Sequence, residues 1–164
     1  MTQIKNKTIL KKTLWLWGPF FLLLGFVWFW SGKVSQIKPQ VHFDNGYFYE
    51  NKDLGFSLSL PASFKYFQTQ RKKGDKFVEI EFFVPTSDKY YHQLVPGYAR
   101  AFVIRLIDKK DYDSYKDGQV RWQKIGQRQN KIYLISFWAK PPADWQDKWS
   151  QDLEEKIKQT VTIK

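Results

Sequence analysis

The feature that most constrains this chain is an uncharged stretch of twenty residues near its N-terminus. Residues 13–32 contain no Asp, Glu, Lys or Arg, and most of them are Leu, Phe or Trp. As an α-helix, twenty residues rise about 30 Å, which is the thickness of the hydrocarbon core of a bilayer. Trp15 and Trp17 lie near one end and Trp28 and Trp30 near the other, as is typical of indole rings at the two membrane interfaces. We therefore predict a single transmembrane helix at 13–32.

The charges that flank this span predict its orientation. Four lysines precede it without any acidic residue, and two follow it before residue 39. Because the more positive flank stays in the cytoplasm, we expect 1–12 to be a cytoplasmic tail. Residues 33–45 then form a tether, and 46–164 form an extracytoplasmic domain of a single-pass plasma-membrane protein.

Two other interpretations of the apolar stretch are weaker. A cleaved signal peptide has a shorter apolar region and small residues at its cleavage site, whereas Phe26–Lys33 offers no Ala-x-Ala pattern. A buried core helix that is apolar on every side requires a larger protein around it.

Composition narrows the class of the remaining domain. Aromatic residues make up 19% of the chain, which favours a folded body, and there is no cysteine. Disulfides, cysteine-bound zinc and thiol nucleophiles are thereby excluded. After residue 39 the chain has 21 basic and 16 acidic residues, so the domain is mildly basic. That balance favours anionic surfaces as partners and does not indicate specific nucleic-acid recognition.

Alternating apolar residues predict an α+β fold with a mostly antiparallel sheet of five to seven strands packed by helices. Phe56, Leu58 and Leu60 share one face of a half-buried strand that ends at Pro61. The other expected strands are 47–49, 77–84, 99–107, 120–125, 131–138 and 160–163. Segments 61–76 and 85–98 are expected to be loops, the first with a helical turn at 62–64. We expect 126–130 to be a hairpin connection and 108–118 to contain a short helix.

One long helix is predicted near the C-terminus. Trp145, Trp149, Leu153 and Ile157 recur every four residues, which indicates an apolar stripe facing the sheet over 145–159. Asp144 is positioned to cap this helix.

The stretch Asn51–Phe64, together with a Trp-bearing helix that leads into Lys158–Ile163, resembles PsbP-like extracytoplasmic domains. Domains of this family often begin with a Gly-Phe strand that closes in Pro-x-x-Trp, and here Phe64 takes the place of the Trp. The resemblance implies a sandwich of helices and sheet over 46–164. Because the family shares no active site, it also implies non-catalytic binding rather than a particular reaction.

Four side chains are candidates for catalysis. Glu79 and Glu81 share one face of a strand, and Asp88 and His92 lie in the 85–98 loop. Paired carboxylates or a histidine base could serve a surface hydrolase that acts on wall or lipid material. We interpret Glu79 and Glu81 instead as a solvated strand face opposite Val78 and Ile80. The sequence indicates no catalytic residue, cofactor or metal: the acidic segment 108–118 lacks the spacing of a calcium loop.

Two surfaces are better candidates, and both are binding surfaces. Basic residues cluster in two segments, and we expect them to contact an anionic surface polymer or lipid head groups: Arg71, Lys72 and Lys73, then Arg121, Lys124 and Arg128, with Lys76 and Lys131 beside them. Tyr90, Tyr91, His92 and Tyr98 form a candidate surface for a partner protein, because binding surfaces favour tyrosine. The sequence thus predicts a membrane-anchored, non-catalytic binding or accessory module, with a surface hydrolase or nucleic-acid capture as alternatives.

Overall fold

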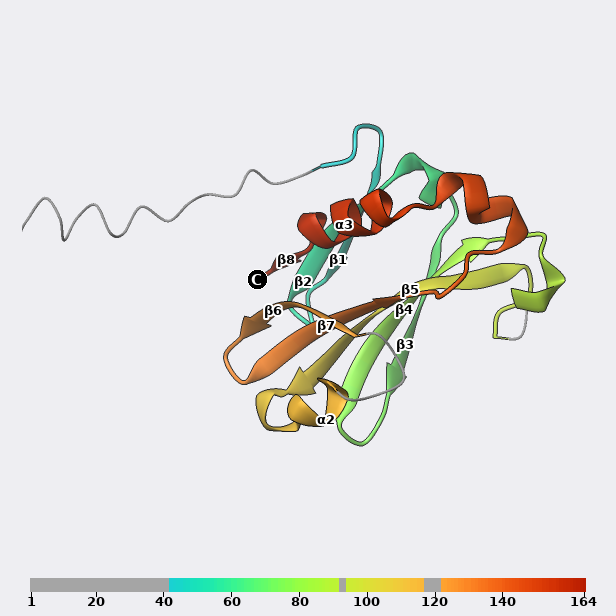
Figure 1. Ribbon diagram of the computed structural model, residues 1–164. Coiled ribbons are helices and arrows are strands. Elements are labelled where there is room, and N and C mark those ends of the chain that lie inside the picture. The colour runs from blue at the N-terminus through green and yellow to red at the C-terminus, as the bar shows by residue number, and fades with distance from the viewer. Residues whose placement is uncertain (1–41, 92–93, 117–121) are drawn as a thin grey trace, which may run out of the picture. The chain divides into compact units, whose positions relative to one another are not determined.

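The computed structural model describes residues 42–91, 94–116 and 122–164. All of them belong to the compact unit Gln40–Lys164. Two antiparallel sheets, one of three strands and one of five, form an α+β fold with few helices (Figure 1). This confirms the α+β class and the antiparallel pairing, although the described residues form eight strands rather than five to seven, and these divide between two sheets instead of forming one.

The small sheet has the order β1-β2-β8, with β1 at Tyr47–Asn51, β2 at Phe56–Leu60 and β8 at Thr162–Ile163. Every residue of the central strand β2 is buried, including its two serines. Phe56, Leu58 and Leu60 face the core, as their alternation predicts. The last strand is shorter than the predicted 160–163.

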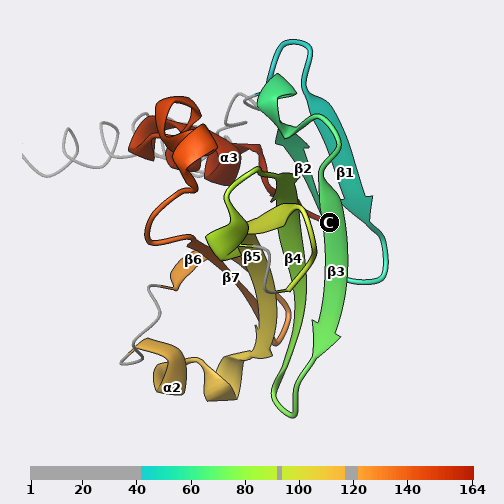
Figure 2. The same cartoon turned by 90° about the vertical axis from the view of Figure 1, so that its right-hand side faces the viewer.

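The five-stranded sheet has the order β3-β4-β5-β7-β6. Its strands are β3 (Gln68–Lys73), β4 (Phe77–Pro85), β5 (Tyr98–Asp108), β6 (Gln123–Arg128) and β7 (Lys131–Phe137). The β3–β4 and β6–β7 connections are hairpins, so their turns project from the sheet as short loops (Figure 2). β5 lies in the centre of the sheet, as its apolar content on both faces predicts.

The main core lies between one face of the large sheet and the small sheet. Aromatic rings fill much of it: Phe82 of β4 stacks on Phe102 of β5 with ring centroids 4.3 Å apart. Phe82 also meets Tyr49 of β1 edge to face, so the same ring joins both sheets. A smaller cluster of Ile107, Ile132 and Leu134 occupies the opposite face of the large sheet.

Short helices complete the fold. The 3₁₀ helices are η1 (Ala62–Phe64), η2 (Lys89–Tyr91), η3 (Lys109–Asp111) and η4 (Ala143–Lys148), and the α-helices are α2 (Asp113–Lys116) and α3 (Gln151–Thr160). The helical turn at 62–64 and the short helix within 108–118 are confirmed. Aromatic rings of Tyr112 and Tyr115 near α2 pack against the smaller cluster.

The prediction of a single helix at 145–159 is wrong, because Trp149 interrupts the helix. Trp149 is extended, with φ −114° and ψ 131°, and separates η4 from α3. Ser150, rather than Asp144, caps α3: its side chain accepts a hydrogen bond from the Leu153 backbone N–H at 3.2 Å. The apolar stripe nevertheless faces the core, since Trp145 and Ile157 are buried.

Two further predictions need correction. Segment 61–76 is not all loop: β3 pairs with β4 along an edge of the sheet, and its six side chains are all exposed. The second hairpin turns at Gln129 and Asn130 rather than over 126–130, since Arg128 pairs with Lys131. Gly126 lies within β6 beside a β-bulge. A Cβ at this position would overlap Ile163, which explains why the residue is glycine.

Among the described residues, no helix has the length and apolar character needed to cross a membrane. The span predicted at 13–32, the tail at 1–12 and most of the tether lie outside the described residues.

Candidate functional site

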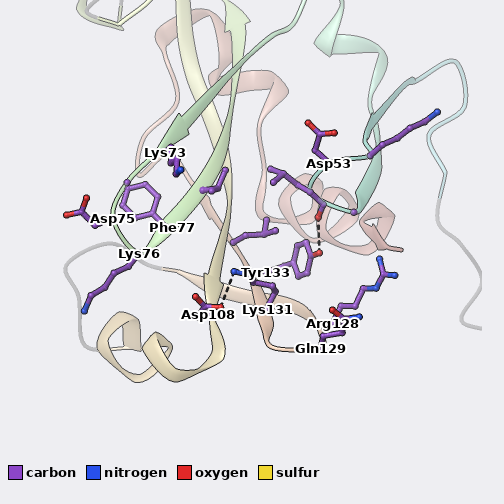
Figure 3. Close-up of a pocket in the computed structure, with 16 residues that line it drawn as sticks. Asp53, Lys73, Asp75, Lys76, Phe77, Asp108, Arg128, Gln129, Lys131 and Tyr133 are labelled. Atoms are coloured by element: carbon purple, nitrogen blue, oxygen red, sulfur yellow. Dashed lines mark hydrogen bonds and ion pairs between the residues drawn. The ribbon is translucent and has the colours of Figure 1, made fainter.

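A cavity of about 470 Å³ lies where three turns meet at one end of the two sheets. The β1–β2 turn contributes one wall, the β3–β4 hairpin a second, and the β6–β7 hairpin a third (Figure 3). Its volume is within the range of small-molecule sites. The charged residues of its lining are Lys52, Asp53, Lys73, Asp75, Lys76, Asp108, Arg128 and Lys131.

Ion pairs neutralise several of these charges. Lys131 Nζ lies 3.0 Å from Asp108 Oδ1, and Lys76 Nζ lies 3.9 Å from Asp111 Oδ1 outside the cavity. Asp53 is paired with Arg71 at 3.4 Å. Some of the cations in the cavity are therefore already paired and are not free to bind a ligand.

Three cations remain without a carboxylate in ion-pair range among the described residues: Lys52, Lys73 and Arg128. All three are exposed, and each comes from a different wall of the cavity. Among the described residues, Asp75 is the one carboxylate of the cavity lining that has no cation within ion-pair distance. Positive charge therefore predominates among the unpaired groups of the cavity.

The base of the cavity is apolar, and a hydrogen bond holds part of it in place. Leu54 and Leu106 are buried, and Val78 is half-buried beside them. The Tyr133 hydroxyl donates a hydrogen bond to the Leu54 carbonyl at 2.9 Å, which fixes the β1–β2 turn to β7. Burial raises the pKa of Tyr133, so this hydroxyl keeps its proton at neutral pH.

Gly55 lies next to Arg128 in a crowded part of the cavity wall. It has φ +67°, a conformation that favours glycine, and a Cβ there would lie 3.3 Å from Arg128 Nη1 and 3.5 Å from the Tyr133 hydroxyl oxygen. That Cβ would also lie 3.2 Å from the Lys164 main-chain oxygen, so a larger residue here would press on both the guanidinium and the C-terminus.

No family model, curated protein or solved structure matches this chain. The chemistry of the cavity is accordingly the best guide to what it holds. An arginine and two lysines over an apolar base are suited to an anion that carries a carbon skeleton. Both predicted basic segments contribute to it, through Lys73 and Arg128.

The other predicted basic residues lie elsewhere or are already engaged. Arg71 pairs with Asp53, and Lys72 Nζ lies 3.9 Å from Glu79. Lys124 donates a hydrogen bond to the Gln127 side chain at 3.0 Å. Arg121 lies outside the described residues. The sequence does not single out Lys52 as a binding residue, because an isolated lysine in a turn carries no pattern.

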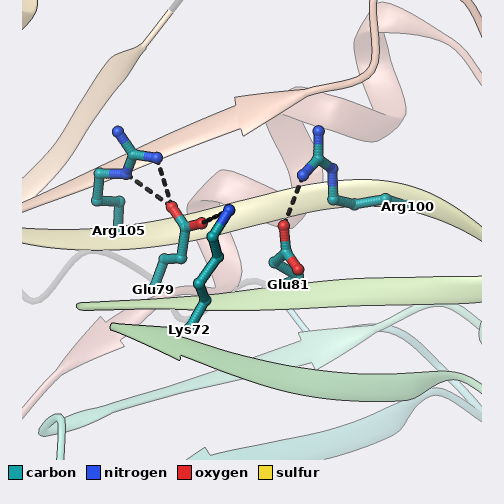
Figure 4. A network of polar contacts seen from close by, with 5 residues as sticks. All are labelled: Lys72, Glu79, Glu81, Arg100 and Arg105. Atoms are coloured by element: carbon teal, nitrogen blue, oxygen red, sulfur yellow. Dashed lines mark hydrogen bonds and ion pairs between the residues drawn. The ribbon is translucent and has the colours of Figure 1, made fainter. Parts of the chain in front are cut away.

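The prediction that Glu79 and Glu81 form a solvated face is wrong. Only 2% of Glu79 and 4% of Glu81 is exposed. Arg105 reaches Glu79 Oε2 through Nε at 2.7 Å and Nη2 at 2.6 Å, and Arg100 Nη1 lies 2.5 Å from Glu81 (Figure 4). The carboxylates are buried because arginines of β5 pair with them across the strands.

Aromatic rings also pack against the guanidinium of Arg105. Its guanidinium carbon lies 3.9 Å from the ring centroid of Phe77 and 4.2 Å from that of Trp122. A guanidinium between two aromatic faces gains cation–π attraction and loses contact with water. Charged and aromatic groups thus cover the outer face of the large sheet together.

The 85–98 loop is held to the C-terminal segment, and its tyrosines differ in exposure. Asp144 accepts hydrogen bonds from the Thr86 hydroxyl at 2.6 Å and the Ser87 backbone N–H at 3.0 Å. The Tyr91 hydroxyl donates to the Lys140 carbonyl at 2.9 Å.

Tyr90, by contrast, is 88% exposed, and Leu94 is also exposed. Tyr98 is half-buried in β5, and His92 lies outside the described residues. Of the predicted partner surface, Tyr90 is the one fully exposed residue that the structure describes, and the exposed Leu94 of the same loop was not among the predicted residues.

Acidic residues do not assemble into a metal site in the described ranges, where no group of three potential ligands is close enough to hold an ion. Asp108 and Asp111 of the acidic segment are in ion pairs with lysines. The end of that segment, 117–118, lies outside the described residues.

Proposed function

We propose that this protein is a membrane-anchored, extracytoplasmic, non-catalytic module that binds an anionic surface polymer. The observation that carries the proposal is the cavity of three walls, each of which supplies one unpaired cation: Lys52, Lys73 and Arg128. Cations that line one concave surface attract an anionic chain more strongly than the same charges spread over a sphere.

The anchor predicted at 13–32 would hold such a module at the membrane surface. A short tether confines the domain near the bilayer, which raises its effective concentration at the surface. The resemblance to PsbP-like domains is compatible with this role, since that family implies binding without a shared active site.

The placement of the acidic residues supports binding over hydrolysis. Glu79 and Glu81 are held by arginines, and Asp88 accepts hydrogen bonds from the backbone N–H groups of Tyr90 and Ala143. Of the described candidates for catalysis, none lines the cavity. A hydrolase that works by general acid–base catalysis needs its acid and its base around one substrate.

Binding is tested with the full-length protein in detergent and immobilised polyphosphate as the probe polymer. The variant Lys52→Gln/Lys73→Gln/Arg128→Gln removes the three cavity cations. The matched control Lys109→Gln/Lys140→Gln/Lys156→Gln removes the same charge from exposed positions outside the cavity. We expect about tenfold weaker binding for the cavity variant and little change for the control. Equal losses in both variants, or no binding by the wild type at physiological salt, would reject the proposal.

Topology is tested separately by protease treatment of intact, wall-stripped cells that express the protein with a C-terminal tag. We expect the tag to be lost from intact cells while an N-terminal fragment stays in the membrane fraction. Protection of the tag until the cells are lysed would place the domain in the cytoplasm and contradict the proposal.

The exposed Tyr90 and Leu94 favour a second candidate, a contact with a partner protein at the 85–98 loop. A photo-reactive phenylalanine analogue at position 90 should then yield one specific cross-linked product in cells. The same analogue at the exposed Tyr66 is the control. Products that are the same from both positions would contradict this candidate.

A further inference from the structure

The cavity has more structure than a general attraction for negative charge requires. Diffuse binding needs only exposed cations, whereas here the cations surround an apolar base of Leu54, Val78 and Leu106. The volume of about 470 Å³ also exceeds what a bare anion fills, and it is suited to a ligand with a carbon skeleton.

Arg128 is the cation best placed to select the anion. A guanidinium offers parallel N–H donors that match two oxygens of one phosphate, whereas lysine acts as a point charge. In the described part of the chain no carboxylate is in ion-pair range of Arg128, and the neighbouring Gly55 has no side chain to cover its Nη1. Its donors are therefore free for a ligand.

The balance of charge favours phosphate over carboxylate. Lys52, Lys73 and Arg128 face a single unpaired carboxylate, Asp75, among the described lining residues. A carboxylate ligand brings one negative charge, whereas a phosphate monoester carries close to two at neutral pH. The doubly charged group compensates the unpaired cations better.

From this geometry we propose that the cavity binds a phosphate ester of a small polyol or sugar. Arg128 holds the phosphate, Lys52 and Lys73 supply further charge from the other two walls, and the carbon skeleton lies on Leu54, Val78 and Leu106. This inference rests on the proposed function, because the phosphate monoester would be the terminal group of the anionic polymer.

The test uses the full-length protein in detergent, titrated by calorimetry with glycerol 3-phosphate, inorganic phosphate and glycerol. We expect saturable one-to-one binding of glycerol 3-phosphate, about tenfold tighter than that of inorganic phosphate, because only the ester contacts the apolar base. Glycerol alone should not bind measurably. Equal affinities for the ester and for inorganic phosphate would show that the carbon skeleton does not bind to Leu54, Val78 and Leu106, and would overturn the proposal.

Variants then test the role of Arg128. Arg128→Gln should weaken glycerol 3-phosphate binding about tenfold, Arg128→Lys should weaken it less, and the control Lys140→Gln should leave it unchanged. Arg128 is exposed, so these variants should keep the thermal unfolding midpoint of the wild type. Undiminished binding by Arg128→Gln would overturn the proposal.

The two proposals fail in distinguishable ways. If the wild type binds immobilised polyphosphate through its cavity cations but does not bind glycerol 3-phosphate, the polymer-binding function stands and the phosphate-ester site is wrong. If the wild type binds neither probe, both proposals are wrong.

Discussion

Arg105 holds Glu79 through two nitrogen atoms at once, with Nε 2.7 Å and Nη2 2.6 Å from the same carboxylate oxygen. The two residues face each other in register on adjacent central strands. A buried carboxylate is tolerated only when such partners replace the water that it has lost. This ion pair is therefore part of the packing on the outer face of the large sheet.

Arg105→Gln should reduce the free energy of unfolding by about 3 kcal/mol, because Glu79 would stay buried without its main partner. Chemical unfolding followed by fluorescence measures the change. Arg71→Gln is the matched control: it breaks a pair whose Asp53 side chain is 78% exposed, so the unfolding free energy should hardly change. Equal losses in the two variants would contradict a special role for the buried pair.

Gly55→Ala should destabilise the protein and weaken binding at the cavity. The substitution strains the backbone at φ +67° and brings a Cβ to 3.3 Å from Arg128 Nη1. Gly97→Ala separates these two effects, because Gly97 has φ +78° but no atom within 4 Å of a built Cβ. We expect both variants to lose about 1 kcal/mol of unfolding free energy from the backbone, and only Gly55→Ala to bind glycerol 3-phosphate more weakly. Weaker binding in both would contradict the local effect.

Gly126→Ala should destabilise the protein by about 2 kcal/mol, because the new methyl group would overlap Ile163 Cδ1 where β6 meets β8. In an Ile163→Val background, which lacks that Cδ1, the same substitution should cost clearly less. Thermal unfolding of the four proteins in this cycle measures the coupling. Additive effects would show that Ile163 is not the obstacle.

Asp144 should make stability fall in acid. Burial alone would raise the pKa of this carboxyl, but hydrogen bonds from Thr86 and Ser87 together hold it below its ordinary value of 3.8. Because the folded-state pKa is the lower one, the stabilisation is present above the unfolded pKa and is lost as pH falls through the folded pKa. The Asp144→Asn variant should therefore lose less stability than the wild type between neutral pH and pH values below 3.8. Thermal unfolding at several pH values provides the measurement, and parallel curves would contradict the prediction.

The elements that the sequence predicted well are those with apolar side chains at every second position. Phe56, Leu58 and Leu60 placed their strand correctly, although the strand is fully buried rather than half-buried because Ser57 and Ser59 are covered as well. β3 was missed because all its side chains are exposed and only its backbone pairs with β4. The break at Trp149 was missed because an apolar stripe continues through it.

The candidate site was predictable only in its parts. Both basic segments were identified, but their meeting at one cavity depends on two hairpins turning at the same end of the fold. Alternation placed Glu79 and Glu81 on one face but could not show that this face is covered. Arg100 and Arg105 on the next strand were the available signal, because opposite charges on neighbouring strands can pair across a sheet.

The exposed edge strand β3 affects how neighbouring copies of the domain behave. Its free edge carries Arg71, Lys72 and Lys73 in succession. If two such edges approached each other, like charges would face one another before backbone hydrogen bonds could form. At the high local concentration that the proposed membrane anchor would produce, this repulsion would keep copies of the domain from joining edge to edge into a continuous sheet.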